Sequence, residues 1–343
     1  MKRIIQSLAA ALVGAALLVP AAAQAQAPEK KKVTIAVGGK KLFYYLPLAV
    51  AERQGYFKDE GLDVEIPNFA GGSQALRALV GGSADMVSGA YEHTINMVAK
   101  KQPIKAVVLQ AKYSSMVLLM PNERAARYRG GRDLKGLKIG VTAPGSSTNM
   151  FVNALLAKDG LKPTDVVIVG VGTGSGAVAA MEKGEIDALV NLDPVITQLE
   201  STGKFRSVVD TRTEKGMNEV YGGDYHASVI YIQEEFIKKY PNTVQAVVNA
   251  MVRANRWIAK STPQQIVDLM PDEFKAGNPS LYKEGLLKNM IGYSEDGQMT
   301  MKAAQNVYKV LEQFEPSVKA AGKMDLTQTF DNTFARKAAA KYK

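Results

Sequence analysis

The chain has 343 residues, of which 46% are hydrophobic and 22% charged, and it contains no Cys. This length is typical of two domains, and the composition is that of a globular protein with a substantial core. The absence of Cys excludes thiol catalysis, disulfides and Cys-ligated metals. The formal net charge is +10, but Lys and Arg are scattered rather than gathered in a basic stripe, so no nucleic-acid partner is predicted.

Residues 1–25 have the features of a secretory signal peptide. Lys2 and Arg3 precede an apolar run from Ile4 to Pro20, and Ala23-Gln24-Ala25 is a small-residue cleavage site. The apolar run is short for a membrane-spanning helix, and no Cys follows it to carry a lipid. We therefore expect an exported, periplasmic protein without a lipid anchor.

After this leader, apolar alternation and glycine-rich turns predict strands and helices in turn up to residue 232. Pro47 is placed to open a helix that runs through Phe57. Strands are expected at 33–38, 61–66, 86–88, 104–110, 116–120, 137–141, 188–190, 205–209 and 227–232. From Pro241 onward the pattern is helical, over 242–259, 263–270, 279–291 and 300–315.

The sequence contains an internal repeat, Gly72–Asp85 and Gly174–Asp187, with a constant offset of 102 residues. Each copy follows an apolar strand and reads as a glycine-rich turn, a Ser at the expected helix N-cap, a short helix and a second strand. Two β-α-β units of this kind predict an α/β fold with two Rossmann-like lobes and a ligand cleft between them.

The repeat places one copy in each lobe. Lobe 1 is expected to comprise residues 31–115 and 227–343, and lobe 2 residues 116–226. A polar, basic stretch from Pro121 to Gly131 is interpreted as the crossing into lobe 2. The helices after Pro241 are expected to pack back onto lobe 1.

Several motifs occur in an order that resembles a known family. They are LAVAERQGYFKDEGLDVEI, GGSQALRALVGGSADM, DLKGLKIGVTAPGSSTNM, MEKGEIDALVNLDP and ASVIYIQEEFIKKYPNTVQAVVNAMVRANRWIA. Over residues 33–260 the chain is similar to the extracytoplasmic solute-binding proteins of ABC importers, in the branch that binds aliphatic sulfonates, taurine, nitrate and pyrimidine vitamin precursors.

This resemblance implies the two-lobed type II periplasmic binding protein fold, a non-catalytic role without a cofactor, and a monomer that delivers its solute to a transmembrane permease. The chain departs from the family at two points. Relatives often carry Trp two residues before the Asp-Pro pair, where this chain has Asn191. The Cys-rich motif of the pyrimidine-precursor binders is absent. Both departures leave the identity of the solute open.

The strongest candidate for the ligand site is the run Ser146, Ser147, Thr148 and Asn149. Small polar residues at a strand-to-helix turn bring hydroxyls, backbone N–H groups and a helix N-terminus to one point, which favours an anion. Simple N-capping is the alternative, although it requires only one such residue. Gly72 and Ser73 hold the corresponding turn of the first repeat, where a tight turn with a cap explains them equally well.

Other candidates are aromatic or titratable residues near expected loops. Tyr44, Tyr45 and Tyr91 are predicted to wall the ligand, with Tyr113 and Tyr225 considered beside them, although packing is the commoner role of any one Tyr. His226 lies at the expected return crossing, and Asp193 opens a helix, where it either contacts the ligand or serves as an N-cap. Glu92, His93 and Asp193 would suit a ligand that carries an amine. No metal site is predicted.

Two enzyme classes stand as alternatives. Gly172–Ala177 fits G-x-G-x-x-A, and Asp193 lies 21 residues beyond Gly172, as in dinucleotide-binding folds. The first copy of the repeat lacks this pattern, and the leader has no Arg-Arg pair for export of a folded holoprotein. A hydrolase is the other alternative, although neither G-x-S-x-G nor H-E-x-x-H occurs. The sequence therefore predicts a binding protein rather than an enzyme.

Overall fold

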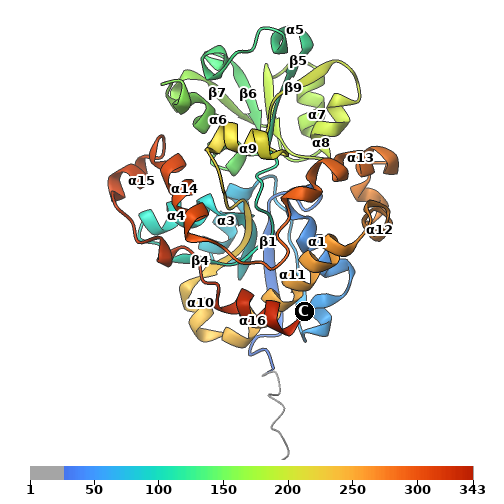
Figure 1. Cartoon of the computed structure of the whole chain (residues 1–343), viewed down its shortest axis with the longest axis vertical. Helices are drawn as coiled ribbons and strands as arrows, with labels where there is room; N and C mark the ends of the chain where they lie inside the picture. Colours follow the sequence, from blue (N-terminus) through green and yellow to red (C-terminus); the bar gives the residue numbers. More distant parts are fainter. Residues whose placement is uncertain (1–26, 343) are drawn as a thin grey trace, which may run out of the picture.

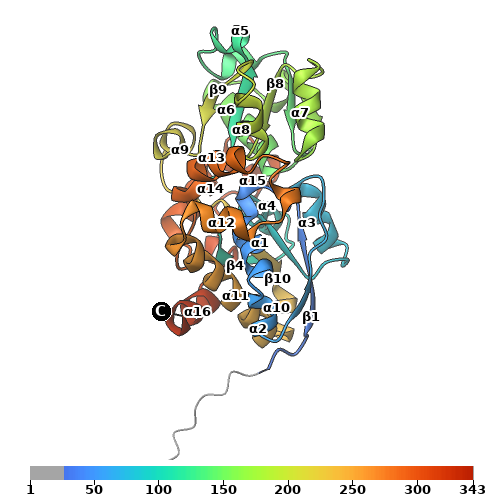
Figure 2. The same cartoon turned by 90° about the vertical axis from the view of Figure 1, so that its right-hand side faces the viewer.

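The computed structural model describes residues 27–342, and the predicted signal peptide lies outside them. Two five-stranded sheets, each covered by helices, form two lobes, with lobe 1 below lobe 2 in Figure 1. Figure 2 shows the same two lobes after a quarter turn about the vertical axis. Within residues 27–342, no helix combines the length and the apolar character needed to cross a membrane.

Lobe 1 is built on the sheet of order β2-β1-β3-β10-β4. Its strands are β1 (Lys32–Val37), β2 (Asp63–Glu65), β3 (Met86–Ala90), β4 (Ile104–Leu109) and β10 (Ser228–Gln233). Its helices are α1 (Leu46–Arg53), α2 (Tyr56–Asp59), α3 (Gly72–Val80), α4 (Glu92–Ala99), α10 (Glu234–Lys239), α11 (Pro241–Lys260), α12 (Pro263–Leu269), α13 (Pro279–Asn289), α14 (Met301–Glu312), α15 (Pro316–Ala321) and α16 (Thr333–Lys341).

Lobe 2 is built on the sheet of order β7-β6-β8-β5-β9. Its strands are β5 (Val117–Pro121), β6 (Lys138–Val141), β7 (Val167–Gly170), β8 (Ala188–Asn191) and β9 (Phe205–Asp210). Its helices are α5 (Asn122–Ala125), α6 (Ser147–Lys158), α7 (Ser175–Glu182), α8 (Val195–Glu200) and α9 (Glu214–Tyr221). Short 3₁₀ turns complete both lobes: η1 (Phe43–Tyr45), η2 (Gly131–Leu134), η3 (Pro163–Asp165), η4 (Asp272–Phe274), η5 (Met290–Gly292) and η6 (Leu326–Gln328).

The two sheets have the same topology, which extends the sequence repeat to the whole of each lobe. In each, the second strand of the sheet (β1 or β6) pairs in parallel with the two strands that flank the repeat helix, and one antiparallel strand (β10 or β5) comes from the other side of a crossing. Both antiparallel strands carry an irregularity in register, at Ile230/Tyr231 and at Leu118/Leu119. The inner strands β3, β5, β8 and β10 are apolar and almost fully buried because helices cover both faces of each sheet, whereas β2, β7 and β9 at the sheet edges are partly exposed.

The polar stretch from Pro121 to Gly131 is not the crossing into lobe 2, because β5 already pairs with β8 and β9 of lobe 2. The predicted bounds of lobe 2, residues 116–226, place the change of lobes before this stretch. The chain therefore changes lobes between β4 and β5. The polar stretch is instead the exposed end of lobe 2, where α5 and η2 lie. Low hydrophobicity signalled exposure there rather than a change of lobe.

Helix starts also differ in detail from the predicted caps. The N-cap residues of α3 and α7 are Gly71 and Gly174, and neither Ser73 nor Ser175 caps its helix. The helix predicted from Pro47 to Phe57 is interrupted at Gly55, which adopts a left-handed conformation with φ 74° between α1 and α2. A residue without a Cβ fits that conformation at little cost.

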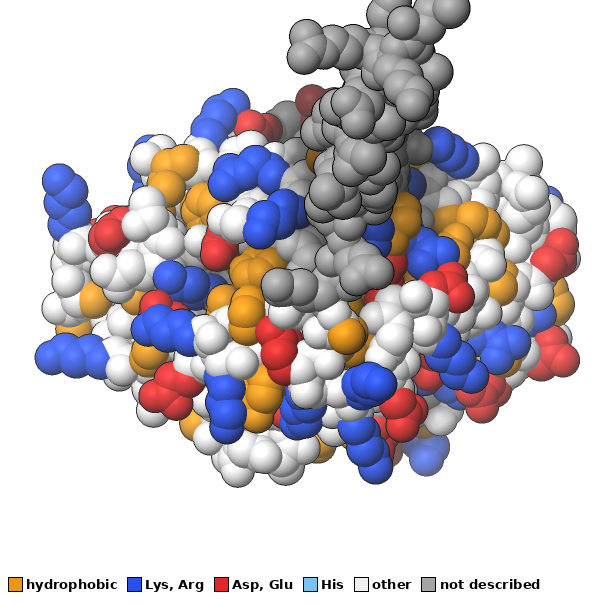
Figure 3. All heavy atoms as spheres, turned by 90° about the horizontal axis from the view of Figure 1, so that it is seen from below, with side chains coloured by type: hydrophobic (Ala, Val, Ile, Leu, Met, Phe, Trp, Pro, Cys, Tyr) orange, Lys and Arg blue, Asp and Glu red, His pale blue; other side chains and the backbone are white. Residues whose placement is uncertain are grey.

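The C-terminal helices pack mainly on lobe 1 but also reach lobe 2. The 20-residue α11 lies against α1, α2 and α16. By contrast, α13 contacts α8 and α14 contacts α6 and α9 across the junction, where Figure 1 draws α13 and α14 in orange. On the face of lobe 1 that Figure 3 shows, basic side chains are interspersed with acidic and hydrophobic ones.

Candidate functional site

Two helix N-termini, one from each lobe, meet at the junction between the sheets. The Ser73 amide at the start of α3 donates to Ser146 Oγ, 3.0 Å away, just before α6. The Ser73 hydroxyl donates to the Pro144 carbonyl at 2.9 Å. Both serine side chains are buried. The lobes are therefore in direct contact here, and the positive ends of two helix dipoles converge on one place.

Glycine makes this close approach possible. A Cβ added at Gly71 would lie 2.7 Å from Ala143 Cβ and 3.0 Å from Ser146 Oγ, both on the opposite lobe. A Cβ added at Gly38, at the end of β1, would lie 2.3 Å from the backbone of Gly71. Any larger residue at Gly71 would thus hold the two helix N-termini apart.

His93 forms a second contact between the lobes. It lies on α4 of lobe 1, is buried, and places Nε2 3.3 Å from the Gly145 carbonyl of lobe 2 and Nδ1 3.2 Å from the Tyr231 hydroxyl. Burial lowers the pKa of His93 to about 4, so the ring is neutral at pH 7. Because a carbonyl only accepts, Nε2 carries the proton and Nδ1 accepts from Tyr231.

Glu92, the first residue of α4, is the most unusual group at the junction. Its side chain is 1% exposed. Oε1 accepts a hydrogen bond from the Tyr225 hydroxyl at 3.2 Å, whereas Oε2 has no partner among residues 27–342. Burial raises the pKa of Glu92 to about 7, against hydrogen bonds from its own backbone amide and from Tyr225. A buried carboxyl group with one free oxygen is poised to bind something else.

Four tyrosines surround Glu92. Tyr44 and Tyr45 come from η1 and stand edge to face, with ring centroids 4.9 Å apart, while Tyr221 and Tyr225 stack at 4.1 Å. Burial, and after it the charge of Glu92, raises the pKa of all four tyrosines, so their hydroxyls stay protonated at neutral pH. Within the described chain the Tyr44 hydroxyl is buried without a hydrogen-bond partner.

In the predicted run Ser146–Asn149 of lobe 2, some side chains stabilise the backbone, whereas other groups are available to a ligand. Thr148 Oγ1 accepts from the Thr142 amide at 3.1 Å, and Asn149 Oδ1 accepts from the Gly145 amide at 2.9 Å. These side chains hold the turn before α6 in place. Burial raises the pKa of the Tyr44 hydroxyl, and the Ser147 side chain lies near enough to lower it slightly. The Ser147 and Thr148 amides belong to the first turn of α6, where backbone donors lack partners within the helix.

Gly72, Ser73, Tyr44 and Tyr45 join this group from lobe 1. A Cβ added at Gly72 would lie 3.4 Å from the His93 ring and 3.7 Å from the Tyr45 hydroxyl. The structure thus brings together eight of the predicted residues in one interlobe cluster: Tyr44, Tyr45, Gly72, Ser73, Ser146, Ser147, Thr148 and Asn149.

Tyr91 and His226, also predicted, lie together on the lobe 1 side of the cluster. The Tyr91 hydroxyl is 2.5 Å from Thr329 Oγ1, and its ring meets that of His226 edge to face. His226 Nε2 contacts the backbone of Thr300, and its Nδ1 has no partner in the described part of the chain. Burial lowers the pKa of His226 to about 4. Tyr91 therefore anchors the C-terminal segment rather than facing Glu92.

Next to His226, a pocket of about 340 Å³ lies between α9, the return crossing and α14. Tyr225 lines this pocket and also donates to Glu92, so the pocket adjoins the buried cluster. Its other walls include Tyr113, Met217 and Thr300.

Asp193, predicted to contact the ligand or cap a helix, binds an amide at the start of α8 and also belongs to a buried ion-pair network. Its Oδ2 pairs with Arg212 Nη1 at 3.1 Å and accepts from Asn289 Nδ2 at 2.7 Å, and its Oδ1 accepts from the Thr197 amide at 2.8 Å. Both oxygens of Asp193 are thus occupied by groups of the protein. These partners could not be predicted, because they lie 19 and 96 residues from Asp193 in the chain.

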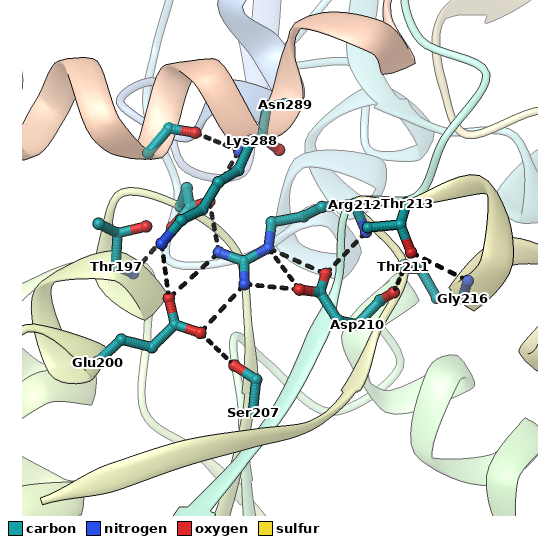
Figure 4. Close-up of polar contacts among 12 residues, drawn as sticks. Thr197, Glu200, Ser207, Asp210, Thr211, Arg212, Thr213, Gly216, Lys288 and Asn289 are labelled. Carbon is teal, nitrogen blue, oxygen red and sulfur yellow. Dashed lines mark hydrogen bonds and ion pairs between the residues drawn. The ribbon is translucent and has the colours of Figure 1, made fainter. Parts of the chain in front are cut away.

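Arg212 is the centre of this network, which Figure 4 shows. Besides Asp193, its guanidinium group pairs with Glu200 at 3.1 Å and with Asp210 at 2.7 Å. Lys288 of α13 reaches Glu200 at 3.1 Å. The network therefore ties α13 to lobe 2.

The predicted ligand-binding residues do not include Glu92, His93, Tyr221 or Tyr225. Glu92 and His93 were expected only to suit an amine-bearing ligand, and Tyr225 was considered only beside the predicted tyrosines. The available signal was the run Tyr91-Glu92-His93 at a strand-to-helix opening, where an acid beside a His is followed by an apolar helix. Tyr221 had no such signal, because only the packing of α9 brings it to Glu92.

Comparison with known proteins gives several likenesses. The sequence pattern of the NMT1-like family matches residues 26–269. A solved structure of a protein from Bordetella bronchiseptica RB50 is 48% identical, with a TM-score of 0.89, and the match covers 92% of this chain and 99% of that one. Among curated proteins, the 4-amino-5-hydroxymethyl-2-methylpyrimidine phosphate synthase of Schizosaccharomyces pombe is 25% identical over 77% of this chain and 76% of its own length.

Two further solved structures share the fold at low identity. The alkanesulfonate-binding protein SsuA from Xanthomonas axonopodis pv. citri, bound to MOPS, is 16% identical with a TM-score of 0.69, covering 89% of this chain and 99% of its own. The periplasmic nitrate-binding protein NrtA from Synechocystis PCC 6803 is 16% identical with a TM-score of 0.71, covering 93% and 90%. These likenesses confirm the predicted fold class, the two-lobed α/β fold of type II periplasmic binding proteins.

Proposed function

Because this chain belongs to the NMT1-like family, we propose that it is a periplasmic solute-binding protein that captures a small anionic solute between its lobes and delivers it to the permease of an ABC importer. The observation that carries the proposal is the convergence of the α3 and α6 N-termini from opposite lobes. The sulfonate and nitrate classes are suggested by the names of two structural neighbours.

In this proposal the protein acts by hinge closure as a monomer. Backbone donors at the start of α6, the Ser147 hydroxyl and the two helix dipoles attract the anionic group. The solute then favours the arrangement in which Ser73 and Ser146 touch, because only there do both lobes contact it. The permease recognises this closed form and accepts the solute.

A synthase activity is the alternative suggested by the curated relatives, which are named as pyrimidine phosphate synthases. A synthase changes its ligand, whereas a binding protein releases it unchanged. Recovery of the bound solute after denaturation, followed by mass spectrometry, separates the two functions. We expect the solute to be recovered intact.

The test of anion capture is calorimetric titration of residues 27–343 with taurine, ethanesulfonate, nitrate and small aromatic carboxylates. We expect at least one anion to bind, and Ser147→Ala to weaken it about tenfold, roughly 1.4 kcal/mol, because a hydrogen bond to a charged group is lost. The matched control is Ser175→Ala, at the first position of α7. The proposal fails if no anion binds, or if both variants bind like the wild type.

A second prediction concerns closure itself. Gly71→Ala keeps the extended backbone of that residue (φ −170°) unstrained, but its Cβ would lie 2.7 Å from Ala143 of the other lobe. We expect solute affinity to fall about tenfold while the melting temperature without solute stays within a few degrees, since only the closed arrangement is disfavoured. The control is Gly174→Ala, the N-cap of α7, where nothing lies within 4 Å of an added Cβ. Equal affinities for the two variants would contradict closure at this contact.

A further inference from the structure

The free oxygen of Glu92 calls for a partner that the described chain does not supply. An unpaired buried polar atom destabilises a folded protein, and a carboxylate oxygen more than most. Oε2 is buried without a partner in residues 27–342, and so is the nearby Tyr44 hydroxyl. Two such atoms in one interlobe cluster indicate a place held ready for a ligand rather than a gap in packing.

No cation of the described chain neutralises Glu92. Burial and hydrogen bonds, from its own backbone amide and from Tyr225, are what act on its carboxyl group. The ion pairs within residues 27–342 are formed by other acidic side chains. A positive charge or a strong donor must therefore come from outside the chain if Glu92 is to be ionised when the lobes are closed.

The surroundings of Glu92 also fit such a donor. The four rings present π-systems, which attract cations and N–H groups, and they come from both lobes and from the return crossing. Tyr44 and Tyr45 lie on lobe 1, whereas Tyr221 ends α9 of lobe 2. The enclosure is therefore complete only when the lobes are together.

We propose that the site binds a solute with a second functional group, a nitrogen that donates N–H to Glu92 Oε2 within the ring of tyrosines. This inference rests on the proposed function and narrows it. The anionic end of the solute lies at the α3 and α6 N-termini, and its amine or amidine-like end lies against Glu92. Aminoalkanesulfonates and amino acids carry both groups, whereas nitrate and plain alkanesulfonates lack the donor.

The experiment compares matched solutes that differ in one nitrogen. Taurine is titrated against ethanesulfonate, β-alanine against propionate, and 4-aminopyrimidine against pyrimidine, with wild type and with Glu92→Gln. We expect at least one N–H member to bind tenfold or more tightly than its partner, and Glu92→Gln to abolish that preference while the partner binds as before. The control is Glu315→Gln, a partly buried acid whose pKa is also raised and which lies near Lys100 at the far end of α4.

The outcomes separate the two proposals. If ethanesulfonate or propionate binds as tightly as its amino partner, or if Glu92→Gln keeps the preference, the donor inference is overturned while anion capture stands. Equal binding would mean that Glu92 is protonated and itself donates to the solute. If none of the six solutes binds, the donor inference is overturned, and anion capture falls with it only if nitrate and the aromatic carboxylates also fail to bind.

Tyr44→Phe gives an independent reading of the same site. The Tyr44 hydroxyl is buried without a hydrogen-bond partner in residues 27–342, so its removal is expected not to lower stability but to weaken binding of the N–H solute at least threefold. Tyr282→Phe is the matched control, because within the same residues its hydroxyl is also buried without a partner but lies on α13 against Phe43. Equal effects of the two variants on affinity would overturn the role given to Tyr44.

Discussion

Replacing Arg212 with Met is expected to lower the free energy of unfolding by about 3–5 kcal/mol. The Arg212 side chain is 3% exposed and pairs with Asp193, which is fully buried, and with Glu200 and Asp210. Without the guanidinium group, Asp193 would keep only the Asn289 and Thr197 donors against its charge. Urea denaturation at pH 7 measures the loss.

The control for this prediction is Arg124→Met. Arg124 pairs with Asp187 in the same lobe at 3.1 Å, but both side chains are more than a third exposed. Exposed pairs contribute about 0–1 kcal/mol, so this variant should unfold close to the wild type. If the two Met variants are destabilised equally, burial is not what makes the Arg212 network important.

The same network links stability to the candidate site. The Asp193 carbonyl accepts from the Phe43 amide at 3.0 Å, and Phe43 opens the η1 turn that carries Tyr44 and Tyr45. Asn289 and Lys288 extend the network to α13. Contacts thus run from Arg212 through Asp193 to the η1 turn, whose Tyr44 and Tyr45 belong to the candidate site.

Much of the architecture could be predicted because it depends on local signals. The repeat around Ser73 and Ser175 places a glycine-rich turn between strand and helix in each lobe, and both turns form where the repeat predicts. The cap positions differ because a Gly can precede the helix as readily as a Ser. The antiparallel insertion of β5 and β10 could not be predicted, since it depends on pairing between distant segments.

The helix N-termini of the candidate site, with Tyr44 and Tyr45 beside them, were predictable from the sequence, whereas Glu92 was not. Ser146 and Ser147 lie at a strand-to-helix turn that is recognisable from its run of small polar residues. Glu92 acquires its character from burial among tyrosines that are separated from it by up to 133 residues. Asp193 is the opposite case. Its position at the opening of a helix suggested either a ligand contact or a cap, but Arg212, 19 residues further along the chain, binds its carboxylate.

The pH dependence of stability gives the second large effect, through Glu92→Gln. The folded pKa of Glu92 is about 7, against 4.5 for the free side chain. Because the pKa of Glu92 is higher in the folded protein, folding favours the protonated carboxyl group. Its stabilisation of the fold is fully present below pH 4.5 and is lost as pH rises to 7. Gln does not titrate, so the variant should gain on the wild type by about 3 kcal/mol across this window. Urea denaturation at several pH values between 4 and 8 measures the difference.

Several nearby groups do not disturb this comparison. The four tyrosines remain neutral throughout, since their pKa values are raised. His93 and His226 have pKa values near 4, so their protonation destabilises the fold as pH falls. This loss occurs in both proteins and cancels in the difference between their free energies of unfolding. The control is Glu234→Gln, because Lys105 lowers the pKa of Glu234 and the change with pH should be small and of opposite sign.

Parallel stability curves for wild type and Glu92→Gln would contradict the raised pKa. If the curves diverge as expected, a bound N–H solute should remove the divergence, because it stabilises the ionised carboxylate and lowers the pKa of Glu92. Binding near pH 6 would then release a proton, which calorimetry in buffers of different ionisation enthalpy detects. A plain anion would produce the reverse, uptake of a proton, because it favours the neutral acid.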